Sequence, residues 1–150
     1  MNALKRVGVI TLSVFAACLL ALLLLCPAVN DMSAKEVMNE LCRIPLPEGT
    51  RRLDQTSQAG KLVGNGNGMQ FFGAILIESS LSLEELDEYY SRYRDDEWSC
   101  TVDRQAGPEI QIIEHGTLAF AQDPGSSNCY IVYSWGDGIE PFSFFDLRGH

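Results

Sequence analysis

Met69-Gln-Phe-Phe-Gly-Ala-Ile-Leu-Ile-Glu78 is the stretch of sequence that decides the fold. Apolar side chains occupy most of its consecutive positions, so both faces of a strand formed here would be apolar. Such a strand is predicted to lie at the centre of a sheet that is covered on both sides. Residues 51–63 form a second extended segment, and Gly64-Asn-Gly-Asn-Gly68 joins the two. Asn-Gly pairs between two such segments predict a hairpin, because both residues tolerate positive φ angles.

Two capping boxes predict where helices begin. Ser82-Leu-Glu-Glu85 opens a helix over residues 83–94, with tyrosines on one side and acidic residues on the other. Ser33-Ala-Lys-Glu36 opens a short helix over residues 34–42, which the following prolines end.

The remaining sequence is typical of β structure. Strands are expected over residues 98–103, 110–114, 117–121 and 128–135, with a last edge strand over residues 142–147. The order of elements predicts an α+β domain in which one main helix and a short N-terminal helix pack on an antiparallel sheet.

The N-terminus contains 23 consecutive residues without a charge, from Val7 to Val29. As a helix they would reach about 34 Å, enough to cross a hydrocarbon core of about 30 Å. Lys5 and Arg6 precede this segment, so residues 1–6 are expected in the cytoplasm and residues 30–150 outside, as one extracytoplasmic domain. The alternative is a signal peptide cleaved near Ala28, with secretion of the domain. Neither cysteine of the segment fits a lipidation signal well.

The charge balance excludes some partners. The chain carries 11 basic and 20 acidic residues, and every acidic residue lies after position 30. Nucleic acids and anionic lipids are bound by clustered lysines and arginines, which this acidic domain lacks. No nucleic-acid partner is therefore expected.

Three cysteines fall in the expected domain: Cys42, Cys100 and Cys129. At most one intramolecular bridge can form among three thiols, and Cys100 with Cys129 is the pair that neighbouring strands would bring together. The alternative is that both are ordinary buried thiols. No cysteine lies at a spacing typical of a metal site or a redox motif, so no metal ligand is assigned.

The glycine-rich loop is the main candidate contact surface for a ligand or partner. Its residues are Gly64, Asn65, Gly66, Asn67 and Gly68, and Gln70 follows in the next strand. Three glycines allow another backbone to approach closely. A phosphate-binding loop would run into a helix, whereas this one runs into a strand. The alternative is a hairpin turn with no binding role.

Other polar and aromatic residues suggest weaker sites. Glu114 and His115 could serve an acid–base mechanism, although a His-Gly turn is usually exposed and idle. The acidic clusters lack EF-hand spacing and are explained by exposed helix surface. Five aromatic residues could line a cleft or form core, with core favoured: Tyr89, Tyr90, Tyr93, Trp98 and Trp135. No catalytic residue and no cofactor is assigned.

Two parts of the chain resemble known bacterial proteins. Ser57-Gln-Ala-Gly-Lys-Leu-Val-Gly-Asn-Gly-Asn-Gly-Met-Gln70 and Gly73-Ala-Ile-Leu-Ile77 resemble small, uncharacterised single-pass proteins of Firmicutes, over residues 44–98. Residues 82–98 resemble many bacterial extracytoplasmic α+β modules. Neither resemblance brings catalytic residues or a ligand.

Taken together, these features predict a membrane-anchored extracytoplasmic module that binds or positions an envelope or membrane protein. One alternative is a small envelope hydrolase. Another is an accessory subunit whose apolar helix docks among the helices of a larger membrane protein.

Overall fold

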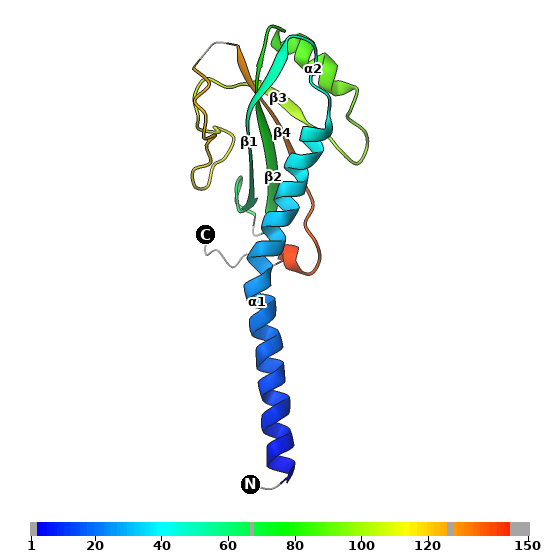
Figure 1. Cartoon of the computed structure of the whole chain (residues 1–150), viewed down its shortest axis with the longest axis vertical. Helices are drawn as coiled ribbons and strands as arrows, with labels where there is room; N and C mark the ends of the chain where they lie inside the picture. Colours follow the sequence, from blue (N-terminus) through cyan, green and yellow to red (C-terminus); the bar gives the residue numbers. More distant parts are fainter. Residues whose placement is uncertain (1–2, 67, 126–127, 145–150) are drawn as a thin grey trace.

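The computed structural model describes residues 3–66, 68–125 and 128–144 and has an α+β fold (Figure 1). A long helix leads into a four-stranded antiparallel sheet. The elements are α1 (Ala3–Arg43), β1 (Thr50–Gly60), β2 (Gln70–Ser79), α2 (Leu83–Ser91), β3 (Thr101–Arg104), β4 (Cys129–Gly136) and a 3₁₀ helix (Phe142–Phe144).

The strand order β1-β2-β4-β3 places β2 inside the sheet, as its apolar sequence predicts. β2 pairs with β1 on one side and with β4 on the other, and both of its faces are buried. The predicted hairpin between β1 and β2 is confirmed, with Gly60 opposite Gln70. Its connection is a longer loop, in which Gly64 adopts a positive φ of 68°.

α1 corrects the prediction of a membrane segment followed by a separate short helix. A single helix of 41 residues passes through Pro27 and through the capping sequence at Ser33. The hydroxyl of Ser33 donates to the carbonyl of Val29 at 3.2 Å, one turn back, and so does not cap a helix start. Because helical residues lie on both sides of Ser33, the local capping signal has no helix end to act on.

The C-terminal part of α1 packs across the sheet. Its buried side chains are Ala34, Val37, Met38 and Leu41. The helix backbone comes so close to β2 at Gly73 that only a residue without a Cβ atom fits there. α1 therefore packs on the centre of the sheet, whereas the expected main helix, α2, packs towards β3.

The helices and the irregular segments cover opposite faces of the sheet. Leu41 of α1 and Leu86 and Tyr90 of α2 share one core cluster with side chains of β2 and β4. On the other face, Ile110, Ile113 and Phe120 pack against Phe72 and Leu76. Figure 1 shows the yellow segment after β3 on the side of the sheet away from α1.

Two predicted strands, over residues 110–114 and 117–121, are wrong. These residues form irregular structure with one isolated bridge, between Glu109 and Ala119. Their apolar side chains pack on the sheet, and the segment adds no strand to it. Alternation of apolar and polar residues fits both arrangements, so the pattern alone could not distinguish them. The strand expected over residues 142–147 is also not seen: Phe142–Phe144 is a 3₁₀ helix, and residues 145–147 lie outside the described residues.

Candidate functional site

A groove runs beside the C-terminal part of α1 and has a volume of about 640 Å³. We call it the α1 groove. Three segments that are distant in sequence form its walls: α1 itself, the turn before β3 and the end of β4. The side chains used in the argument below are Met32, Glu36 and Glu40 from α1, Glu97 and Trp98 from the turn, and Asp137 and Ile139 after β4.

The turn before β3 is held by Asp95. Its carboxylate accepts from the backbone amides of Glu97 at 2.9 Å and Trp98 at 2.7 Å, and its own amide donates to the Trp98 carbonyl at 2.9 Å. The hydroxyl of Ser134 in β4 donates to the carbonyl of Ser99 at 2.6 Å. These bonds attach the turn to the sheet, so Glu97 and Trp98 stand in a defined place opposite α1.

Within the described residues, the end of β4 that borders the groove has no strand paired on its outer edge. β3 pairs with β4 only as far as Tyr133, opposite Thr101, while β4 continues to Gly136. Trp135 and Gly136 line the groove at this end of β4. An unpaired strand edge presents backbone donors and acceptors to which an extended chain can bind.

Among the described residues, the groove is lined by four carboxylates and by no lysine or arginine; the carboxylates are Glu36, Glu40, Glu97 and Asp137. Arg43 pairs with Glu36 at 2.7 Å, and this hydrogen bond lowers the pKa of the exposed Glu36 carboxyl. The other three have no ion-pair partner within the part of the chain that the structure describes. The groove therefore favours a cationic occupant.

The aromatic residues divide between groove and core. Trp98 lines the groove and a smaller adjoining hollow of about 310 Å³, which it shares with Glu40 and Tyr93. Tyr90 is fully buried beneath α2, as core. The Trp135 ring packs on Phe72 at 4.9 Å, and Trp135 also borders the groove at the end of β4.

The predicted contact loop is held by hydrogen bonds at its two ends, Gly64 and Gln70. Gln70 accepts from the amides of Leu62 at 2.8 Å and Val63 at 2.9 Å, and donates to the Val63 carbonyl at 3.2 Å. Its amide group is thus used inside the hairpin. Gly64, Asn65, Gly66 and Gly68 are exposed, and Asn67 lies outside the described residues.

The structure brings the loop together with Glu114 and His115, which sequence analysis treated separately. The Glu114 carboxylate accepts from the Gly64 amide at 2.7 Å, and Nε2 of His115 bonds the Gly64 carbonyl at 2.7 Å. The backbone amides of both residues donate to the Leu62 carbonyl. The side chains of Glu114 and His115 therefore hold the two peptide groups on either side of the Gly64 Cα atom.

Cys100 and Cys129 lie on opposite faces of the sheet. Cys100 belongs to the cluster under the helices and Cys129 to the cluster under the loops. The described structure contains no disulfide between them, because the sheet separates the two thiols. Burial raises the pKa of the Cys100 thiol. Both cysteines are buried, as the alternative expected.

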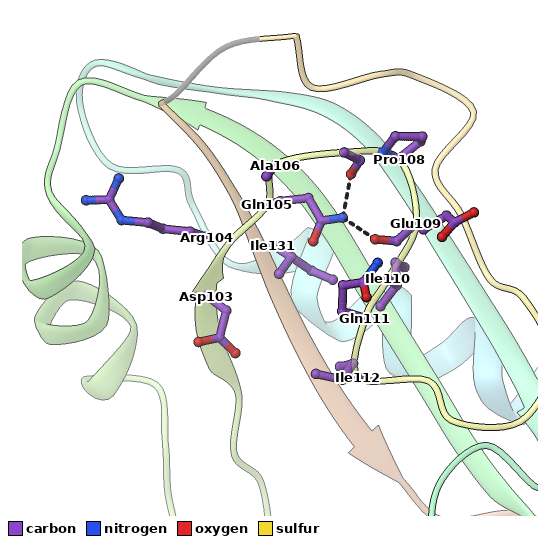
Figure 2. Close-up of a pocket in the computed structure, with 11 residues that line it drawn as sticks. Asp103, Arg104, Gln105, Ala106, Pro108, Glu109, Ile110, Gln111, Ile112 and Ile131 are labelled. Carbon is purple, nitrogen blue, oxygen red and sulfur yellow. Dashed lines mark hydrogen bonds between the residues drawn. The ribbon is translucent and has the colours of Figure 1, made fainter.

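A second hollow of about 640 Å³ lies between the end of β3 and the following loop. Figure 2 shows the Gln105 amide pointing into that loop, where it donates to the carbonyls of Gly107 at 2.6 Å and Glu109 at 2.8 Å. Arg104 points away from the loop, and its guanidinium lies over the Tyr130 ring at 5.7 Å. The Gln105 amide is thus already hydrogen-bonded to the loop. The α1 groove is therefore the stronger candidate for a binding site.

Among the described residues, no group of three or more histidine, cysteine and carboxylate side chains could hold a metal ion. Comparisons with protein-family models, with curated proteins and with solved structures found no match.

Proposed function

We propose that the protein is a membrane-anchored extracytoplasmic binding module that takes an extended, basic segment of an envelope or membrane protein into the α1 groove. The observation that carries this proposal is the open end of β4, bordered by carboxylates without ion-pair partners in the described structure. A strand edge supplies backbone hydrogen bonds, and the carboxylates supply selectivity for lysine and arginine side chains.

The aromatic side of the groove supports the same class of partner. Trp98 is partly buried; Glu97 precedes it in the turn, and Glu40 of α1 lines the same groove. A lysine or arginine held by these carboxylates could also lie on the indole face, and cation–π attraction is strongest for tryptophan.

The N-terminal part of α1 supports a membrane anchor. This helix is long and apolar enough to cross a bilayer, and the same pattern is typical of a signal sequence. Its large apolar residues are exposed from Val7 to Leu25, and burial begins at Cys26. The exposed stretch is about 28 Å long as a helix, close to the thickness of a hydrocarbon core. On the positive-inside rule Lys5 and Arg6 stay in the cytoplasm and the groove lies outside.

The hydrolase alternative has less support. Among the described residues, the side-chain hydrogen bonds of Glu114 and His115 go to the backbone of Gly64. The accessory-subunit alternative shares the exposed apolar helix with our proposal but leaves the α1 groove without a use.

The test is a titration of the full-length protein in detergent micelles with an arginine-rich peptide as the probe. In the Trp135→Phe variant Trp98 is the single tryptophan, so its fluorescence reports on the groove. We expect a saturable change that weakens with added salt. Removing two groove charges, Glu40→Gln with Glu97→Gln, should weaken binding by about two- to thirtyfold, since each pair contributes about 0.2–1 kcal/mol.

The matched control is Glu84→Gln with Glu88→Gln on the exposed side of α2, which changes the net charge by the same amount. This control should bind the peptide as tightly as the parent. Equal weakening in both double variants would show that only overall charge matters, and the groove would lose its assigned role.

A further inference from the structure

The segment after β4 has two large apolar side chains that are exposed. Ile139 is 55% exposed and Phe144 is 70% exposed. Phe144 is the last residue of the 3₁₀ helix Phe142–Phe144, and Ile139 lies three residues before that helix begins. Outside α1 these are the two most exposed of the large apolar residues in the described chain. Exposed apolar residues that gather in one short segment indicate an interaction surface.

This segment is attached to α1 where the exposed apolar stretch of the helix ends. The Phe142 carbonyl accepts hydrogen bonds from the side-chain amide of Asn30 at 3.3 Å and from the Cys26 thiol at 3.5 Å. Cys26 directly follows Leu25, the last residue of the exposed stretch. Figure 1 shows the orange-red segment beside α1, at the end of the sheet domain nearest the N-terminal part of the helix.

The depth of the segment follows from helix geometry. Cys26 to Asn30 lie within about 8 Å of Leu25 along the helix axis. The polar interfacial layer on each side of a bilayer is of about that thickness. If residues 7–25 fill the hydrocarbon core, then the segment attached at Cys26 and Asn30 lies at the level of the lipid headgroups.

We propose that the segment from Ile139 to Phe144 rests on the lipid of the leaflet from which α1 emerges, with Ile139 and Phe144 at the boundary between headgroups and acyl chains. This inference rests on the proposed membrane anchor. Isoleucine and phenylalanine suit that boundary, where apolar side chains enter by about 5–10 Å. Asp137 and Glu140 are exposed and remain in water. Lipid contact would hold the α1 groove at a set height above the membrane.

The test uses a photo-crosslinking amino acid in the full-length chain, reconstituted in phosphatidylcholine nanodiscs, with lipid adducts measured by mass spectrometry. The probe replaces Ile139 in one sample and Phe144 in a second. Leu22, 49% exposed within the apolar stretch, is the positive control. Leu46, 37% exposed just beyond the far end of α1, is the negative control. Leu46 lies three residues after Arg43, and Arg43 lies about 25 Å along the helix from Cys26.

We expect lipid adducts at Ile139 and Phe144 that approach those at Leu22 and exceed those at Leu46 by about tenfold, because only the former reach the acyl boundary. Adducts at Leu22, with Ile139 and Phe144 no better than Leu46, would overturn the inference and leave the anchor standing. Crosslinks to a second copy of the chain in place of lipid would overturn it as well. Absence of adducts at Leu22 would instead contradict the anchor itself.

Discussion

Gly73 is the residue at which helix and sheet approach most closely. A Cβ atom built there would overlap the backbone nitrogen of Met38 and would lie 2.8 Å from the carbonyl carbon of Val37. A Cβ atom added at Gly136 would likewise overlap the side chain of Val37. These two glycines let α1 lie directly on β2 and β4, and so they set the position of the wall that α1 forms in the groove.

The first prediction is that Gly73→Ala destabilises the protein. In a strand, alanine normally costs less than glycine, but here the new methyl group meets helix backbone that cannot rotate aside. Overpacking of this kind costs about 1–3 kcal/mol. Denaturant unfolding of the full-length protein in micelles measures the change. Gly66→Ala is the control, because no atom lies within 4 Å of its added Cβ, and a loss of similar size there would disprove the explanation.

The second prediction concerns the thiols of the domain. Burial raises the pKa of Cys100, so little of the reactive thiolate forms at neutral pH, and the side chain is shielded as well. Cys42 is only partly buried, with its thiol 3.2 Å from the amide oxygen of Gln55. We expect iodoacetamide to modify Cys42 before Cys100 and Cys129 in the folded protein.

Mass spectrometry of the labelled peptides, without reduction, checks both the order of reaction and the thiol state. Unfolding in guanidinium should make the three sites react at similar rates. A peptide pair joined through Cys100 and Cys129 would contradict their placement on opposite faces of the sheet.

At the scale of the elements, the two capping boxes have different outcomes. Ser82 caps α2: its hydroxyl accepts from the Glu85 amide at 3.2 Å, and the Glu85 carboxylate accepts from the Ser82 amide at 2.8 Å. These bonds lower the pKa of the Glu85 carboxyl. Ser33 has the same sequence context but lies inside α1. A capping box stabilises a helix end only where the chain before it leaves the helix.

The third prediction compares these two serines. Ser82→Ala should cost about 1 kcal/mol of stability, since it removes a cap at a true helix start. Ser33→Ala should change stability by less than about 0.5 kcal/mol, because alanine is the better helix former and no cap is lost. Unfolding of both variants under the same conditions measures the difference. Equal losses would mean that α1 breaks near Ser33.

The stabilising effect of the Ser82 cap is expected to decrease at low pH. The folded-state pKa of Glu85 is lowered, so its stabilising effect is present above the unfolded pKa and is lost as the pH falls through the folded value. The stability difference between the parent and Ser82→Ala should therefore shrink below about pH 4.5. A difference that stays constant down to pH 3 would show that Glu85 does not take part in the cap.

For the whole molecule, α1 is both the apolar N-terminal helix and a layer of the domain. Val37, Met38 and Leu41 are at most 5% exposed, and they cover the sheet. Burying three such side chains contributes about 5–8 kcal/mol, as much as a small domain's entire stability. The sheet therefore depends on the same helix that is proposed to enter the membrane.

The fourth prediction follows from this dependence. A chain that begins at Asp31 keeps the covering residues of α1 and should fold as a soluble monomer. A chain that begins at Ile44 uncovers the part of that face on which α1 packs and should aggregate. Gel filtration and circular dichroism compare the two. Soluble, folded protein from the shorter chain would show that α1 is dispensable to the domain.

Several features follow from the sequence by itself. The unbroken apolar run predicts that β2 is internal, the glycine-rich connection predicts the β1–β2 hairpin, and Ser82 with Glu85 predicts the start of α2. The uncharged stretch from Val7 to Val29 likewise predicts a long apolar helix. Each signal depends on residues within a few positions of one another, so it acts before any distant part of the chain is in place.

The tertiary structure alone decided the rest. Packing on the sheet and unbroken helix on both sides override the capping box at Ser33, and the sheet separates Cys100 from Cys129. The loop at Gly64 meets Glu114 and His115 across 50 positions of the chain. The α1 groove joins residues near positions 36, 97 and 137, whose proximity depends on the pairing of β4 with β2 and β3. Such contacts form only when the whole sheet is assembled, and no local pattern of residue types encodes them.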